Sequence, residues 1–210
     1  MLMRLKRTIR LFLLIAGFWA IAPVSANEGS VGELVQERIE DLMSHIQQLK
    51  KEKVALSQLK AMAQKKLIDN WDVQGSLVSL VGKSRWGLLS ADKQKQLIQE
   101  FQSTLTRYFI EVYSHFDDQR VYYDKLKLNK NYNKGWAKVI VSADYLPDFA
   151  IDIKIVNKNK QWMYQDIRVH GVSYLKMKRS YYSNTLDKQG ADHLIAELRK
   201  KNVSFFGSYR

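Results

Sequence analysis

The sequence predicts an α+β domain in which helices cover one face of a curved antiparallel sheet of about four strands. Two observations support this prediction. Apolar residues recur at helical spacing as far as His115, and from Gln119 onward they alternate with polar residues, as in strands with one buried face. The chain has 210 residues, of which 46% are hydrophobic and 26% charged, which suffices for one domain with a sizeable core.

The first 26 residues have the pattern of a secretory signal peptide. Basic side chains precede an apolar stretch at 11–22, and the small residues at 24–26 suit cleavage after Ala26. A membrane anchor is the alternative, but a span needs roughly 20 apolar residues and Pro23 interrupts this stretch earlier. We therefore expect residues 1–26 to be a cleaved signal peptide and the mature chain to begin at Asn27.

The charge of the chain limits its partners. The formal net charge is +13 at pH 7, and it falls to +9 if residues 1–26 are removed. A basic surface attracts acidic partners. Because export separates the protein from nucleic acid, we expect anionic lipid headgroups or an acidic protein instead. Cysteine is absent, which excludes disulfides, thiolate metal sites and cysteine nucleophiles.

Four helical segments precede the strands. Apolar residues at helical spacing predict helices over 31–49 and 56–67 and a short one around 77–81. The clearest helix begins after Ser90, a favourable N-cap, and ends near His115. Its wide apolar face consists of Leu97, Ile98, Phe101, Leu105, Tyr108, Phe109 and Val112.

Strands are predicted over 120–128, 137–145, 149–155 and 161–170, with turn-like residues at 146–148 and 157–160 between them. This order predicts an antiparallel meander. Two C-terminal helices follow, at 174–186 and 191–200, and Gly190 is placed to end the first of them. We expect residues 27–202 to form one domain and residues 203–210 to be a weakly structured tail.

Catalytic and metal-binding patterns are weak. The histidines at 45, 115, 170 and 193 lack the spacing of metal ligands, so we expect no metal site. Asp166, Arg168 and His170 alternate along one predicted strand, which leaves an acid–base pair open. A solvated strand face is the more common explanation of such a pattern.

Large apolar side chains gather in two parts of the sequence. A well-filled core would explain them, and so would an apolar binding pocket. The helical part contributes Trp71, Leu77, Val81, Trp86, Phe101, Leu105 and Phe109, and the strand part contributes Val139, Val141, Phe149, Ile151, Ile153 and Met163.

Four segments of the sequence share motifs with one known protein family. The segment 71–86, WDVQGSLVSLVGKSRW, is similar to a family motif with a Leu-Gly pair before a tryptophan. The helix over 88–113 and the strand-to-helix segment 162–173, which ends in Gly-Val-Ser, match further family patterns, and Gly190, Leu194 and Leu198 match the family's closing helix. The matches follow the family's order and span roughly residues 65–200. In these segments the chain resembles the MlaC/toluene-tolerance family of periplasmic phospholipid-binding proteins.

The resemblance implies a carrier that encloses phospholipid acyl chains in an apolar cavity between sheet and helices. It would shuttle lipid between an outer-membrane lipoprotein complex and an inner-membrane ABC transporter complex, and so maintain the lipid asymmetry of the outer membrane. It implies a monomer in the periplasm, not stably embedded in a membrane, with no cofactor. Ile167, Val169 and Val172 join the apolar residues above as expected contacts of the acyl chains. Basic residues expected at the rim, near the headgroup, are Lys83, Arg85, Arg168 and Lys176.

Two other classes of protein remain open. One is a cone-shaped α+β enzyme of the isomerase or cyclase kind that acts on a small apolar substrate through Asp166 or His170. The other is an interaction module whose interior is fully packed and binds no ligand.

Overall fold

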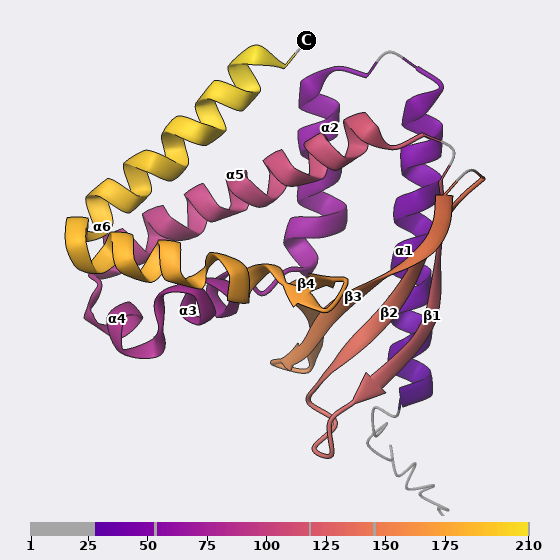
Figure 1. The fold of residues 1–210 in the computed structure, drawn as a ribbon, viewed down its shortest axis with the longest axis horizontal. Coiled ribbons are helices and arrows are strands. Elements are labelled where there is room, and N and C mark those ends of the chain that lie inside the picture. The colour runs from indigo at the N-terminus through magenta and orange to yellow at the C-terminus, as the bar shows by residue number, and fades with distance from the viewer. Residues whose placement is uncertain (1–27, 53, 118, 145, 210) are drawn as a thin grey trace, which may run out of the picture.

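The computed structural model describes residues 28–52, 54–117, 119–144 and 146–209 (Figure 1). The expected signal peptide lies outside these residues. Helices α1 to α5 precede a five-stranded sheet, and a long helix, α6, follows it. The predicted order of helices, strands and C-terminal helices is confirmed.

The N-terminal helices agree with the predicted segments, with one addition. The helix α4 was not expected; Gly82, at a φ of 93°, ends α3 and lets a new short helix begin at Lys83. Ser90 caps α5 by accepting a hydrogen bond from the N–H of Lys93, as predicted. The bounds are α1 Glu28–Lys50, α2 Leu56–Met62, a π-helical turn Ala63–Leu67, a 3-10 turn Ile68–Asn70, α3 Val73–Val81, α4 Lys83–Leu88 and α5 Ala91–His115.

The sheet is an open antiparallel meander in the order β1-β2-β3-β4-β5. It has one strand more than expected, because the two residues of β5 pair with the end of β4. Residues 146–148, expected to form a turn, open β3 instead, where Pro147 is tolerated near the start of the strand. The strands are β1 Arg120–Leu128, β2 Lys134–Ala143, β3 Leu146–Lys158, β4 Gln161–Val169 and β5 Val172–Ser173.

One face of the sheet is covered by helices. Along β2 the buried residues alternate with half-buried ones, as the period-2 pattern predicts. Helix α1 lies along β1, while the other helices gather on the β3–β4 side (Figure 1). Gly32 of α1 lies so close to β1 that a side chain there would meet the Tyr123 hydroxyl. A first core forms between this face, α1, α3, α5 and α6.

A second, smaller core forms where α1, α2 and α5 meet the end of α6. Its buried members are Ile46, Leu59, Met62, Ile110 and Tyr113. The helix α6, Tyr174–Ser208, continues through residues that were expected to form a weakly structured tail. Phe205 and Phe206 pack against the second core, and this burial stabilises the last turns of the helix.

Gly190 divides α6 into two arms. Its φ of 82° and ψ of 173° are not helical, and beyond it the second arm runs back across α5 (Figure 1). This backbone conformation is accessible almost only to glycine. The two helices predicted on either side of Gly190 are therefore confirmed as the arms of α6.

We expect Gly190→Ala to destabilise the protein by about 1–3 kcal/mol, the usual cost of a side chain in this backbone region. No atom lies within 4 Å of the added Cβ, so the backbone alone causes the loss. Gly207→Ala is the matched control, since Gly207 also has open space around it but lies in helical backbone. Urea unfolding should show Gly207→Ala to be neutral or stabilising. Equal stability of the two variants would contradict the assignment.

Candidate functional site: an apolar strip beside two cores

Half of the residues expected to contact acyl chains are packed into the protein core. They make contacts with neighbouring side chains from α3, α5, α6 and the sheet. These residues are Trp71, Leu77, Val81, Trp86, Phe101, Leu105, Val139 and Val141, all buried.

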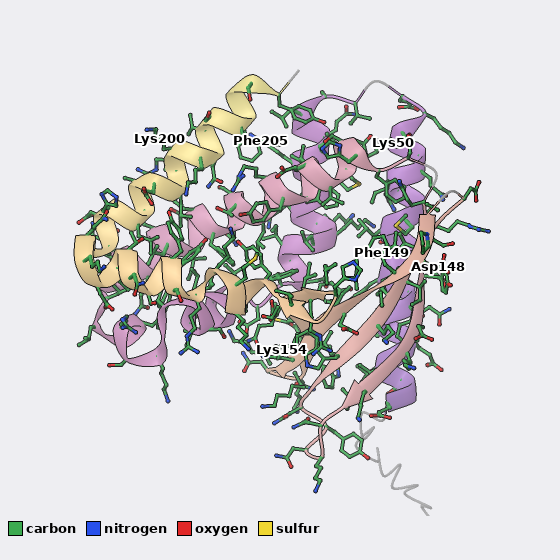
Figure 2. The ribbon with its side chains drawn as sticks, viewed as in Figure 1. Lys50, Asp148, Phe149, Lys154, Lys200 and Phe205 are labelled. Carbon is green, nitrogen blue, oxygen red and sulfur yellow. The ribbon has the colours of Figure 1, made fainter. Side chains whose placement is uncertain are left out.

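A second group lies on the helix-covered face of β3 and β4, half-buried except for Val169, which is exposed. We call Phe149, Ile151, Ile153, Ile167 and Val169 the apolar strip. The register pairs Ile151 with Val169 and Ile153 with Ile167, so these side chains share one face of the sheet. Phe149 and Asp148 point to opposite sides of β3 in Figure 2, with Phe149 on the side of the helices.

Exposure increases along the strip toward the end of β4. Ile153 and Ile167 pack against the first core. Val169 is 37% exposed, and its partner Val172 on β5 is 58% exposed. The strip therefore leads from the packed core to the protein surface.

Apolar side chains of α5 and α1 also pack against the two cores. Leu105 belongs to the first core and Phe109, about one turn further along α5, packs against the second. Met43 of α1 is half-buried and packs against both cores. Val112 of α5 is 66% exposed.

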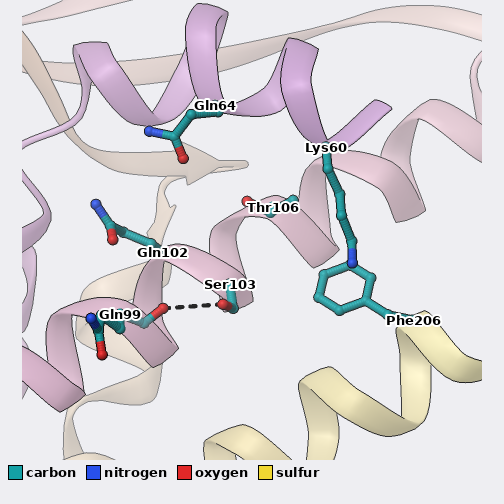
Figure 3. Close-up of a pocket in the computed structure, with 7 residues that line it drawn as sticks. All are labelled: Lys60, Gln64, Gln99, Gln102, Ser103, Thr106 and Phe206. Carbon is teal, nitrogen blue, oxygen red and sulfur yellow. Dashed lines mark hydrogen bonds between the residues drawn. The ribbon is translucent and has the colours of Figure 1, made fainter. Parts of the chain in front are cut away.

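Three pockets lie elsewhere, and none of the three includes a residue of the apolar strip. The largest, of about 350 Å³, lies between α2, α5 and the end of α6 (Figure 3). Its walls are mostly amides and hydroxyls, and Lys60 covers the Phe206 ring at 3.9 Å. Another, of about 310 Å³, contains Met163, which therefore does not belong to the strip.

The four basic residues expected at the headgroup do not form one rim. Lys83 and Arg85 lie on α4, far from β3 (Figure 1). Arg85 binds Asp187 through Nε–Oδ1 and Nη2–Oδ2 contacts of 2.5 and 2.6 Å, which lowers the pKa of that carboxyl. Arg168 points to the sheet face opposite the strip, because its register partner is Asp152. Lys176 is exposed near the start of α6.

Asp166, Arg168 and His170 are each engaged separately. The buried Asp166 accepts hydrogen bonds from the Ser173 hydroxyl at 2.6 Å and from the N–H groups of Ile167 and Leu175, so it holds the start of α6. Arg168 binds Asp152 at 2.9 Å, and its guanidinium lies 4.2 Å from the centre of the Trp136 ring. His170 lies beside Phe149. In the described chain no hydrogen bond joins the three into an acid–base pair.

A polar junction that the sequence did not reveal joins α3 to the sheet. The buried Asp72 caps α3 by accepting from the N–H of Gly75 at 3.0 Å, and it binds Lys158 of β3 at 2.7 Å. Its other oxygen accepts from the side-chain amide of Gln165 on β4 at 3.0 Å. The junction holds the C-terminal end of β3 and the middle of β4 against α3, and these two strands carry the strip.

Residues 28–209, apart from the three undescribed positions within them, include no group of three histidine or acidic side chains that could hold a metal ion. No helix in the same residues is both long and apolar enough to cross a membrane.

Comparisons with known proteins agree with this fold. A solved structure of a phospholipid-binding protein from Ralstonia solanacearum, in complex with a phospholipid, superimposes with a TM-score of 0.71. The alignment covers 83% of this chain and 98% of that one at 17% sequence identity, which shows a shared fold. No curated protein matches the sequence. The family model of the MlaC protein matches residues 36–200, most of the chain, and the protein therefore belongs to the MlaC family.

Proposed function

We propose that the protein is a periplasmic carrier of phospholipid, whose acyl chains lie on the apolar strip. It carries lipid between an outer-membrane lipoprotein complex and an inner-membrane ABC transporter complex, and so maintains the lipid asymmetry of the outer membrane. The observation that carries the proposal is the strip itself, five large apolar side chains next to a packed core, four of them half-buried and one exposed. Membership of the MlaC family and the phospholipid bound to the Ralstonia solanacearum protein support it.

The energetics of lipid transfer explain why such a carrier requires only an apolar surface. Two C16 chains contain about 30 methylene and methyl groups, and burying them is worth roughly 24 kcal/mol at about 0.8 kcal/mol per group. A bilayer offers the same chains a similar environment. A carrier that matches hydrocarbon therefore exchanges lipid with a membrane complex at little net free-energy cost. Valine, isoleucine and phenylalanine side chains suffice for this task, without a cofactor or a catalytic group.

Native mass spectrometry of the protein purified from the periplasm of a Gram-negative host tests the proposal. We expect one phospholipid per chain, and a polypeptide mass that begins at Asn27. A protein that carries no lipid after purification without detergent would favour the fully packed interaction module. Turnover of an apolar substrate without bound lipid would favour the enzyme. A polypeptide that retains residues 1–26 in the membrane fraction would show that this segment acts as an anchor.

A further inference from the structure

The pocket between α5 and the two arms of α6 has a volume of about 260 Å³ and is built from three helix faces. Helix α5 contributes residues at spacings of three and four, and so do both arms of α6, so each set points from one side of its helix. Its members are Thr104, Arg107 and Tyr108 from α5, Tyr174, Met177, Lys178, Tyr181 and Tyr182 from the first arm, and Leu198 and Lys201 from the second.

The pocket is positively charged. Arg107, Lys178 and Lys201 line it, and no acidic residue does. Within the described chain none of these three cations lies within 4.0 Å of a carboxylate. Two acids approach from outside the lining. Glu197 accepts from the Tyr181 hydroxyl, and Glu100 accepts from the Asn202 amide, whose oxygen accepts from Arg107. The cationic charge therefore exceeds the local acidic charge.

Aromatic rings hold two of the cations in place without neutralising them. The Arg107 guanidinium lies 4.5 Å from the centre of the Tyr108 ring. Lys201 lies 4.7 Å from the centre of the Tyr181 ring and donates to the Tyr181 hydroxyl at 3.1 Å. Both cations keep further N–H donors for a ligand.

The phenol groups add neutral donors. Burial raises the pKa of Tyr174 and of Tyr182, so both hydroxyls remain protonated at neutral pH. The Tyr108 and Tyr174 hydroxyls are 3.5 Å apart, a weak mutual hydrogen bond that an anionic acceptor would improve on. Cations and protonated hydroxyls on one small pocket favour a ligand that has several anionic oxygens.

We propose that this pocket binds a phosphate group, through Arg107, Lys178, Lys201 and the tyrosine hydroxyls. A free phosphate or the phosphodiester of a phospholipid could supply the group. The lipid source is geometrically accessible, because Tyr174 follows β5, whose Val172 pairs with Val169 at the exposed end of the apolar strip. The lipid source rests on the proposed function, whereas the phosphate site itself does not.

The experiment compares two double variants of the purified protein. Lys178→Gln with Lys201→Gln removes two cations that line the pocket, and Lys188→Gln with Lys200→Gln removes two exposed cations of the same helix outside it. Inorganic phosphate is titrated by calorimetry against a chloride control of equal ionic strength, because screening alone weakens charge effects. In a second experiment, phosphatidic acid and diacylglycerol with the same acyl chains compete for the protein from vesicles.

For inorganic phosphate we expect the pocket variant to bind at least about tenfold more weakly than the wild type, since one charge-assisted hydrogen bond is worth about a factor of ten or more. The other variant should stay within about twofold. If the pocket variant does not fold, the unfolding midpoint of the wild type is compared between low millimolar phosphate and chloride of equal ionic strength. At these concentrations the general stabilising effect of phosphate is small, whereas a bound ligand raises the midpoint.

The phosphate titration and the lipid competition together distinguish the two sources of phosphate and the two proposals. Preference for phosphatidic acid over diacylglycerol that disappears in the pocket variant supports the lipid source. If the protein binds inorganic phosphate but neither of the two lipids, the phosphate site is supported and the proposed function is overturned. Equal binding of both lipids, with no response to inorganic phosphate, overturns the phosphate site and leaves the proposed function standing.

Discussion

Replacing Ile151 with aspartate is expected to remove at least about nine-tenths of the phospholipid that co-purifies with the protein. Ile151 lies in the middle of β3 within the apolar strip, opposite Val139 on one side and Val169 on the other. A carboxylate placed against hydrocarbon without a partner costs several kcal/mol, and each 1.4 kcal/mol lowers occupancy tenfold. The measurement is the molar ratio of phospholipid to protein after extraction from the purified protein.

Ile140→Asp is the matched control for this substitution. Ile140 lies on the neighbouring strand and pairs with Ala150, so its side chain points to the opposite face of the sheet. It is also half-buried, and the chemical change is the same. We expect this variant to keep its lipid. Val169→Asp provides a second strip variant at a more exposed position, where the folding cost is smaller. Full lipid occupancy in folded Ile151→Asp and Val169→Asp would show that the strip does not hold acyl chains.

The alternation of apolar residues predicts which side chains share a face of the sheet, but not which of them are covered by a helix. Phe149, Ile151, Ile153 and Ile155 occupy every second position of the predicted strand 149–155, and the register places them on one face. Periodicity does not distinguish Ile155, which is 1% exposed, from the half-buried Ile151. The difference arises from which helix lies over each position, and this depends on contacts between segments far apart in the sequence. The sequence therefore predicted the set of apolar candidates and not the subset available to a ligand.

The basic sites show the same division between local and long-range information. Arg168 was expected at the rim, yet its strand position, next to Ile167, places it on the other face and against Asp152. The alternation of side chains along a strand already predicts that Arg168 and Ile167 lie on opposite faces. The pocket of α5 and α6 could not be found in this way, because Gly190 reverses the chain and brings Lys201 beside Tyr181. The sequence alone predicts only a helix over 174–186, whose residues at spacings of three and four share one side.

Asp72→Ala is expected to cause the largest loss of stability among these variants, about 2–4 kcal/mol. The loss of an N-cap costs about 1 kcal/mol, and donors that lose the buried carboxylate as their acceptor add to it. A Cβ on Gly75 would lie 1.9 Å from Asp72 Oδ2, so the carboxylate occupies the space that glycine leaves open. Alanine would leave the Gly75 N–H and the Gln165 amide without their acceptor.

Urea unfolding of three variants separates the two contributions of this carboxylate. Asp72→Asn keeps an oxygen for the Gly75 N–H but loses the charge, so we expect roughly half of the destabilisation. Lys158→Met leaves the cap intact and removes the cation, whose side chain is 43% exposed, so its loss alone should cost less than Asp72→Ala. If the free energy of unfolding of Asp72→Ala lies within about 0.5 kcal/mol of the wild-type value, the junction does not stabilise the fold. A large loss in Asp72→Ala together with a small one in Lys158→Met would show that the cap and the Gln165 contact, rather than the ion pair, hold α3 against β4.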